Sequence, residues 1–476
     1  MLADSPALRR HGRMQITRFI LASLLLSIAT QAAPFKKTLT DATKGYRVGS
    51  WQMVSSDLPG YRGEAKWHIR KRILQGGKQE GVEIIEVDNG KLRFRVIPTR
   101  GMGILDVNLG DVRLGWDSPI KEVVHPKFIN LESRGGLGWI EGFNEWMARC
   151  GLEYAGHPGK DEFITNTGAK GQMDLTLHGK ISNIPASEVI VTVDRQAPHT
   201  IRVRGRVDER VFFGLKLELW TEISTVPGSN TFTISDTLTN RGSEPQEFML
   251  IYHANYGSPL LEKGARLVAA AERVAPFNDH AAKAVKTWDT YAAPKSGFVE
   301  EVFQIFPFAD RTGRTTIQLQ NAQANRAVSM NWLLEDLPYL TQWKNTVAKS
   351  DGYVTGLEPG TSFPHNRKWE RAKGRVSKLA PGQSRSFAIT FGIQTTQAEV
   401  AEVAQSIRAL QRNRQTRVFT RPEADPFPGG DVAEDPGGDT GDTDGAEDGG
   451  GDEGGETISE GGESDPAPDG CGGEVE

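Results

Sequence analysis

Cysteine is scarce in this sequence of 476 residues, which contains only Cys150 and Cys471. So few cysteines exclude a disulfide-stapled scaffold and a cysteine-rich zinc protein. The sequence also lacks a Gly-x-Gly-x-x-Gly segment that opens a helix, and it lacks a Gly-Lys-Ser/Thr loop. A dinucleotide-binding fold and a P-loop enzyme are therefore not expected.

Basic residues are absent from the C-terminal segment. Residues 422–476 contain no Lys or Arg and 19 Asp or Glu, whereas residues 33–421 carry a net charge of +11. A positively charged body attracts anions, so acidic sugars, phosphate surfaces and nucleic acid are candidate ligands. The alternative is that the acidic segment only shields the body and keeps it soluble. Because the sequence has neither zinc-finger spacing nor a basic helix, no nucleic-acid partner is expected.

One apolar run stands near the N-terminus. Phe19–Ala29 is an 11-residue apolar stretch that follows Arg18 and precedes a small-residue site at Ala32. This run is too short to span a bilayer, and its flanks are typical of a secretory signal peptide. We therefore expect a signal peptide region over residues 1–32, a true start at Met14, no stable membrane anchor, and a secreted or periplasmic protein.

The other end of the chain lacks core-forming residues. From Pro422 onward the sequence is rich in Gly, Asp and Glu and has almost no large apolar residue. Such a segment cannot bury enough surface to offset its chain entropy. The composition predicts a disordered acidic Gly-rich tail over residues 422–476 and a single folded domain over residues 33–421.

Within that domain, short alternating segments predict strands. Leu92, Phe94 and Val96 alternate with arginines, and the turn signal Asn89-Gly90 precedes them, which predicts a hairpin. Further strands are expected at Val189–Val193, Ile201–Val207, Phe213–Leu219, Thr231–Leu238, Glu247–Tyr252, Thr315–Leu319 and Ser386–Phe391. Many short strands without helices between them predict an all-β protein, namely a large antiparallel β-sandwich with a few short helices.

Two segments have helical spacing of their apolar residues. Residues 138–149 place Trp139, Phe143, Trp146 and Met147 on one helical face. Residues 397–412 show the same periodicity after a Thr-x-x-Glu sequence that is typical of a capping box. A helix is therefore predicted in each segment.

Few histidines are available for chemistry, because the chain contains nine. His253 and Asn255 share a strand face opposite the apolar residues around Tyr252, so they either line a polar pocket or are satisfied structural residues. His178 precedes Gly179, and a glycine there lets the backbone or a ligand come close. No paired spacing among the histidines supports a metal site, and none is expected.

Three further residues have both a functional and a structural interpretation. Glu358 lies in Gly-Leu-Glu-Pro-Gly, a loop that could aim a carboxylate inward or leave it solvated. Arg100 lies in Thr-Arg-Gly-Met-Gly and could clamp a hydroxyl or carboxylate, or form a surface ion pair. Cys150 has no histidine close in sequence, which favours a buried thiol over a nucleophile.

Seven segments together resemble a known family. In order along the chain they are Val96–Ile104, Gly115–Pro119, Gly135–Trp139, Arg149–Glu153, Leu177–Lys180, Tyr252–Asn255 and Gly356–Pro359. This ordered set is similar to the aldose 1-epimerase, or galactose mutarotase-like, superfamily, and more narrowly to a bacterial branch labelled as a domain of unknown function. The resemblance covers roughly residues 45–395 and implies a β-sandwich whose concave face binds a sugar.

The resemblance also implies roles for individual residues. His253 falls on the family's general acid and Glu358 on its general base, while His178 and Arg100 fall on positions of substrate contact. Asn255 stands where mutarotases have a tyrosine, and we expect it beside the sugar. At neutral pH an ordinary pKa of about 4.3 would leave Glu358 ionised as the base. Its carboxylate would in turn favour a protonated His253, whose ordinary pKa is about 6.5.

The implied reaction needs only these two groups. Removing a proton from the anomeric hydroxyl and delivering one to the ring oxygen opens a pyranose, and the reverse transfers close it on the other face of the carbonyl. No cofactor is expected, and the partner is a sugar or an oligosaccharide end, with acidic sugars left open by the basic body. The alternative is a non-catalytic carbohydrate-binding protein on the same scaffold. The oligomeric state stays open.

Overall fold

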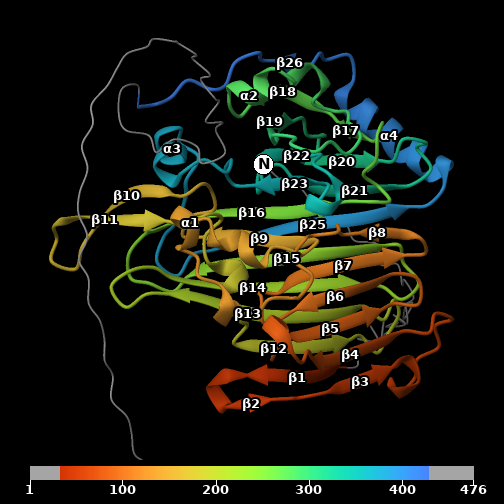
Figure 1. The fold of residues 1–476 in the computed structure, drawn as a ribbon. Helices are drawn as coiled ribbons and strands as arrows, with labels where there is room; N and C mark the ends of the chain where they lie inside the picture. Colours follow the sequence, from red (N-terminus) through yellow and green to blue (C-terminus); the bar gives the residue numbers. More distant parts are fainter. Residues whose placement is uncertain (1–32, 428–476) are drawn as a thin grey trace, which may run out of the picture. The chain divides into compact units, whose positions relative to one another are not determined.

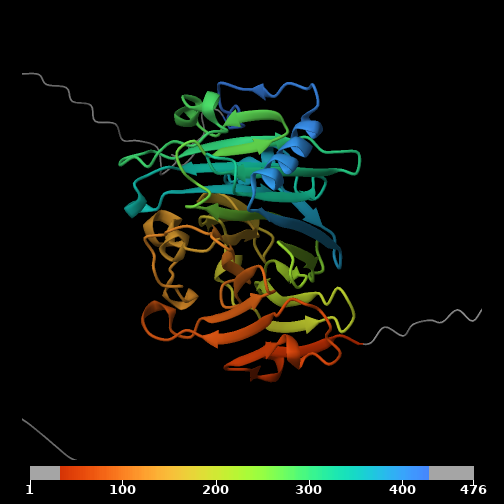
Figure 2. The same cartoon turned by 90° about the vertical axis from the view of Figure 1, so that its right-hand side faces the viewer.

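Two large β-sheets form the framework of this computed structural model, which describes residues 33–427. Figure 1 and Figure 2 show the sheets as two layers. The prediction of an all-β antiparallel sandwich is confirmed: among the described strands, β18 with β26 is the one parallel pair. The predicted signal peptide region 1–32, Cys471 and residues 428–476 lie outside the described residues.

The first sheet has ten strands and an uninterrupted ladder order. From one edge to the other these are β17 (Arg266–Ala269), β20 (Arg314–Gln320), β21 (Ala327–Leu333), β25 (Ser384–Gln394), β15 (Thr231–Asn240), β14 (Lys216–Thr225), β13 (Ile201–Arg210), β12 (Glu188–Val193), β1 (Phe35–Asp41) and β2 (Tyr46–Arg47).

The second sheet has fourteen strands and carries the predicted site motifs. Its order is β26 (Arg417–Val418), β18 (Ala271–Pro276), β19 (Glu301–Pro307), β22 (Tyr339–Asn345), β23 (Val354–Gly360), β16 (Gln246–Tyr256), β9 (Met147–Leu152), β7 (Gly103–Leu109), β6 (Arg93–Ile97), β5 (Glu83–Asp88), β4 (His68–Ile73) and β3 (Trp51–Val54). Two short strands join it from the side, β24 (Ser377–Leu379) on β16 and β8 (Val112–Leu114) on β7. A separate two-stranded ribbon is formed by β10 (Gly159–Ile164) and β11 (Lys170–Leu175).

The edges of both sheets are short. The outermost strands are β2 and β26 with two residues each and β17 and β3 with four residues each. The longest strands of the two large sheets, such as β13, β14 and β15, therefore lie inside a sheet and pair with a neighbour on each side.

Helices are few and short, as predicted. They are α1 (Ser133–Gly136), α2 (Asp279–Ala282), α3 (Arg367–Ala372), α4 (Gln397–Gln411) and the single turns η1 (Ala42–Lys44), η2 (Ser55–Asp57), η3 (Gly77–Gln79), η4 (Pro126–Phe128), η5 (Gly138–Gly142), η6 (Ile181–Asn183), η7 (Val285–Thr287) and η8 (Lys349–Asp351). The predicted helix over 397–412 is confirmed as α4, including its capping box between Thr396 and Glu399.

The predicted helix over residues 138–149 is wrong. The chain there forms η5 and then enters β9, so Trp139 and Trp146 belong to different clusters on opposite sides of the sheet. Gly138 and Gly142 each lie where no side chain fits, so the chain here packs closely on its neighbours instead of forming a helix. A side chain at Gly138 would collide with the carbonyl oxygen of Asn130 at 1.7 Å, so the close backbone approach excludes other residues.

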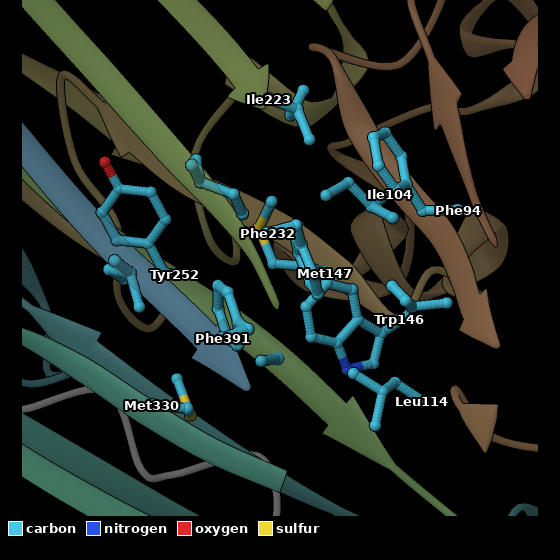
Figure 3. Packing of buried hydrophobic residues seen from close by; sticks show 14 of the residues in the cluster. Phe94, Ile104, Leu114, Trp146, Met147, Ile223, Phe232, Tyr252, Met330 and Phe391 are labelled. Carbon is cyan, nitrogen blue, oxygen red and sulfur yellow. The ribbon is translucent and has the colours of Figure 1, made fainter. Parts of the chain in front are cut away.

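The main core lies between the two sheets and is rich in aromatic rings. Phe232 of β15 stacks on Phe391 of β25 at 5.0 Å between ring centroids and contacts Phe94 of β6 at 5.8 Å. Trp146 meets Phe391 edge-on at 5.0 Å (Figure 3). Because these rings come from both sheets, burying them clamps the two layers together.

A buried ion pair also links the sheets. Arg149 of β9 binds Asp236 of β15 at 2.5 Å, and both side chains are inaccessible to solvent. Arg149 donates as well to the Thr221 hydroxyl of β14 at 2.5 Å, and the Tyr252 hydroxyl of β16 donates to Asp236 at 2.9 Å. These polar contacts fix β9 and β16 against the first sheet, directly beside His253.

A second buried carboxyl makes the stability of the fold depend on pH. Glu209 of β13 is 3% exposed; its Oε2 accepts a hydrogen bond from the backbone N–H of Leu152 at 2.7 Å, and its Oε1 has no partner among the described residues. Burial raises the pKa of Glu209 from 4.5 to about 7. The folded state therefore binds this proton more tightly than the unfolded chain, and the resulting stability is present below pH 4.5 and is lost as pH rises through about 7.

Glu209→Gln is expected to stabilise the protein at alkaline pH. The amide keeps the shape and the acceptor but cannot ionise, so the free energy of unfolding should exceed that of the wild type by up to about 3 kcal/mol above pH 8 and should change little at pH 5. Urea unfolding at both pH values measures the difference. The exposed residue Glu64, changed to Gln, is the matched control. A Glu209→Gln effect of equal size at both pH values would contradict the assignment.

Within residues 33–427, no helix is both long and apolar enough to cross a membrane.

Candidate functional site

The candidate site lies on the face of the fourteen-stranded sheet that points away from the main core. On β16, Leu250, Tyr252 and Ala254 enter that core, so the alternate residue His253 lies on the opposite face, as predicted from the alternation. The chain from Trp116 to Phe143, with α1 and η5, covers this face (Figure 1).

The structure brings His253 and Glu358 into direct contact. Strand β23 pairs antiparallel with β16, and Leu357 lies opposite Ala254. This register places the two neighbouring residues on one face, with His253 Nε2 3.3 Å from Glu358 Oε1. The segment predicted as a Glu358 loop is therefore a strand, which holds the carboxylate more rigidly than a loop would.

Aromatic side chains surround the imidazole of His253. Its ring centroid lies 5.8 Å from that of Trp139, 5.4 Å from that of Phe143 and 5.6 Å from that of Trp343. Trp116 extends the same wall by packing on Phe143 at 4.9 Å. Apolar and aromatic side chains beside a few polar groups are typical of small-molecule sites. Trp146 and Trp332 do not belong to this wall, because they lie in the main core.

His178 joins the same group. Its ring lies 5.2 Å from that of His253 and 4.7 Å from that of Trp139. Nδ1 donates to the carbonyl of Ala155 at 3.0 Å, which leaves Nε2 as the acceptor, and burial lowers the pKa of His178 to about 4. The following Gly179 is explained by the backbone, because a side chain there would lie 2.2 Å from the Tyr154 carbonyl oxygen.

Arg100 and Asn255 support the wall of the site. Arg100 is fully buried, its Nε lies 2.5 Å from Glu145 Oε1, and its Nη1 donates to the Val124 carbonyl. Asn255 donates to the backbone carbonyls of Glu145 at 3.2 Å and of His253 at 3.1 Å. Both side chains are thus held by protein groups, and their predicted contact with a sugar stays a prediction.

Two polar residues that the sequence motifs did not indicate lie beside Glu358 on the next two strands of the sheet. Thr341 of β22 lies opposite Glu358, and Gln304 of β19 lies opposite Thr341. Thr341 Oγ1 and Gln304 Oε1 are buried and have no partner among the described residues. The amide of Gln304 donates to His365 Nε2 at 2.9 Å. Strand register was the missing signal, because neither strand was recognised from its sequence.

Burial shifts the pKa values of both His253 and Glu358 away from their ordinary values, and in opposite directions. Burial lowers the pKa of His253 well below 6.5, and the nearby His178 adds to the shift. Burial raises the pKa of Glu358 well above 4.5, and the charge of Glu300 adds to that shift. Both shifts disfavour the charged forms, so burial opposes the expected combination of a protonated His253 and an ionised Glu358.

The site is nearly closed. The side chains of His253 and Glu358 are 5% and 2% exposed, so a sugar can reach them only after a covering side chain moves. Trp343 is partly exposed, and its indole N–H donates to the exposed carboxylate of Glu300 at 2.6 Å. This pair marks the side of the site that faces solvent.

Gly356 lies where a side chain would strike the pair, which gives a direct test. An added methyl group would meet Glu358 Oε1 at 2.5 Å and the rings of His253 and Trp343 at 3.2 Å. Gly356→Ala is expected to displace the carboxylate and lower any anomer-exchange activity about 100-fold, because misplacing a catalytic group by about 1 Å costs that much.

The control for this variant is Gly49→Ala, since a methyl group at Gly49 meets nothing within 4 Å. The rate comes from proton exchange spectroscopy, and the melting temperature shows whether each variant is folded. If the two folded variants were equally active, the His253–Glu358 pair would not take part in the reaction.

Other candidate chemistry is limited in this part of the chain. Among residues 33–427, no three His, Cys, Asp or Glu side chains lie close enough together to hold a metal ion. Cys150 is fully buried, and burial raises the pKa of its thiol well above 9, which agrees with the predicted buried thiol.

Comparisons with known proteins agree with this fold. The family model described as Domain of unknown function (DUF4432) matches residues 79–393. A candidate aldose 1-epimerase from Klebsiella pneumoniae is 42% identical over 82% of this chain and 100% of its own, with a TM-score of 0.77. A galactose mutarotase-like protein from Clostridium acetobutylicum is 16% identical over 69% of this chain and 98% of its own, with a TM-score of 0.48. No curated protein matches the sequence significantly.

The resemblance found in the ordered motifs is thereby confirmed at the level of family and fold. The family model spans the segments that contain Arg100, His178, His253 and Glu358. The chain belongs to the DUF4432 family and has a galactose mutarotase-like fold.

Proposed function

We propose that the protein is an aldose 1-epimerase-like enzyme, which binds a sugar and interconverts its anomers by acid/base ring opening. The observation that carries the proposal is the direct contact of His253 Nε2 and Glu358 Oε1, 3.3 Å apart, inside a wall of aromatic rings. General acid and base catalysis needs two proton-transfer groups within reach of the reacting atoms, and each typically contributes about 10²–10⁴-fold.

The close spacing suits the reaction. The anomeric hydroxyl oxygen and the ring oxygen are both bonded to C1, so they are neighbours on one side of the sugar. Two groups 3.3 Å apart can therefore serve both oxygens from the same side.

One shared proton is enough for the mechanism. Neutral His253 with protonated Glu358 holds the same number of protons as the ion pair, so a single transfer between the two converts one form into the other. Ring opening takes a proton from the anomeric oxygen and returns one to the ring oxygen, which leaves this number unchanged. Sugar hydroxyls that hydrogen-bond to Glu358 would favour its ionised form, in which it is the base and His253 the acid.

Thr341 and Gln304, which lie beside the His253–Glu358 pair, support the recognition of sugar hydroxyls. Thr341 Oγ1 and Gln304 Oε1 are buried without partners among the described residues, and buried polar groups normally have them. We assign these atoms, with His178, Asn255 and Arg100, to contacts with the sugar. The basic body keeps acidic sugars among the candidates, and we place the protein outside the cytoplasm on the basis of the signal peptide region.

Proton exchange spectroscopy tests this proposal on the whole protein with a panel of neutral and acidic aldoses. Acceleration of anomer exchange above the buffer rate is expected for at least one sugar. A second candidate is a non-catalytic carbohydrate-binding protein, which the near-complete burial of the pair favours. It predicts saturable changes in sugar chemical shift without acceleration, and that outcome would replace the enzyme proposal.

A further inference from the structure

A groove on the ten-stranded sheet carries a concentration of arginines. It lies between the turn that leads into β20 and the C-terminal end of α4, and it has a volume of about 570 Å³. Such a volume is within the range of roughly 300–1,000 Å³ that is typical of ligand sites. Arg311 and Arg314 line it from the turn, and Arg412 and Arg414 line it from the helix end.

The positive charge of this groove is only partly compensated. Asp310 is the one acidic residue among those lining it, and its carboxylate accepts hydrogen bonds from Thr312 and from the backbone of Arg314 within its own turn. None of the four arginines has a carboxylate of a described residue within ion-pair distance. Arg314 donates to the neutral Asn331 at 2.6 Å.

Arg414 is held in place while keeping its charge. Its guanidinium lies 3.5 Å from the centre of the Phe308 ring and donates to the carbonyls of Leu410 and Gln411. Capping the end of α4 explains Arg414, because a cation is favourable at a helix C-terminus. It does not explain Arg311 and Arg314, which come from a different part of the chain and converge on the same space.

We propose that this groove binds a ligand that carries carboxylate, sulfate or phosphate groups. Guanidinium groups match such oxyanions in bidentate geometry, and fixed arginines lose less entropy on binding than free ones. The hydroxyls of Thr316 and Ser406 line the same groove and supply neutral hydrogen bonds to a polar ligand. The site is distinct from the His253–Glu358 pair, because α4 packs on β17 and β20 of the ten-stranded sheet (Figure 2).

Isothermal titration calorimetry of the full chain tests the proposal. The probes are a galacturonate trisaccharide, a sulfated disaccharide and pyrophosphate, with a neutral trisaccharide as control. Saturable binding of at least one anionic probe is expected, and the affinity should fall with added salt. Which probe binds identifies the anionic group that the groove prefers.

The double variant Arg311→Gln/Arg412→Gln is expected to weaken that binding about tenfold or more. Both residues are exposed, so the fold should be unaffected. Arg62→Gln/Arg70→Gln removes the same charge from exposed positions elsewhere and should leave the affinity within about twofold. Equal weakening by the two double variants, or no saturable binding of any anionic probe, would overturn the proposal. Glu358→Gln should bind the probe like the wild type, which keeps this result independent of the proposed epimerase activity.

Discussion

Replacing Glu358 with Gln is expected to lower the anomer-exchange rate about 100- to 10,000-fold while the protein stays folded. The amide has the shape of the carboxyl but cannot take up or release a proton. The fold of the protein should tolerate Glu358→Gln, because burial already disfavours a charged carboxylate at position 358. Exchange spectroscopy gives the rate, and thermal melting gives the stability of the same sample.

The control is Glu300→Gln, which removes a neighbouring charge but leaves the His253–Glu358 contact intact. It should change the rate far less than Glu358→Gln, and His253→Ala should approach the loss seen with Glu358→Gln. If Glu358→Gln retained the wild-type rate in a folded protein, the carboxyl would not be the proton-transfer group. The activity would then have to be assigned to another site.

The largest loss of stability is expected from Asp236→Asn. This change leaves the buried guanidinium of Arg149 without its counter-charge, and breaking a buried ion pair in this way costs about 3–5 kcal/mol. Urea unfolding measures the free energy. Tyr252→Phe is the comparison, because it removes only one hydrogen bond to Asp236 and should cost about 1–2 kcal/mol.

Removing both charges is expected to recover much of the stability that Asp236→Asn loses. In Arg149→Met/Asp236→Leu no unpaired charge remains in the core, and apolar replacements of buried pairs are often neutral. The double variant should therefore be more stable than Asp236→Asn alone. If it were less stable, the hydrogen bonds of this network, rather than its charge balance, would hold the sheets together.

Much of the fold followed from the sequence because strands such as β13 and β15 alternate between buried and more exposed residues. The β5–β6 hairpin forms around Asn89 and Gly90 as predicted, and Asn89 does more than turn the chain. It is fully buried and donates to Thr225 and to the carbonyl of Ser229, so it ties the hairpin to the other sheet. Local patterns show turn chemistry, but they do not show such a contact between distant segments.

The candidate site was predicted only in part, for a related reason. The motifs indicated His253 and Glu358, and the structure places them in contact. Thr341 and Gln304 were missed because they join the pair only through the register of β19, β22 and β23. The pKa shifts of the pair could not be predicted, because the depth of burial depends on the loops that cover the sheet and spacing in the sequence does not report it.

The short outer strands have a consequence for how this protein behaves at high concentration. An exposed strand edge is a template on which another chain can add a strand, and such addition leads to aggregation. The outermost strands of the two large sheets have two to four residues each, and Arg417–Val418 pairs with Arg273 and Val274 of β18. A chain cut before Arg417 would make the six-residue strand β18 the outermost strand of its sheet, so the truncated protein should self-associate more readily than the full chain.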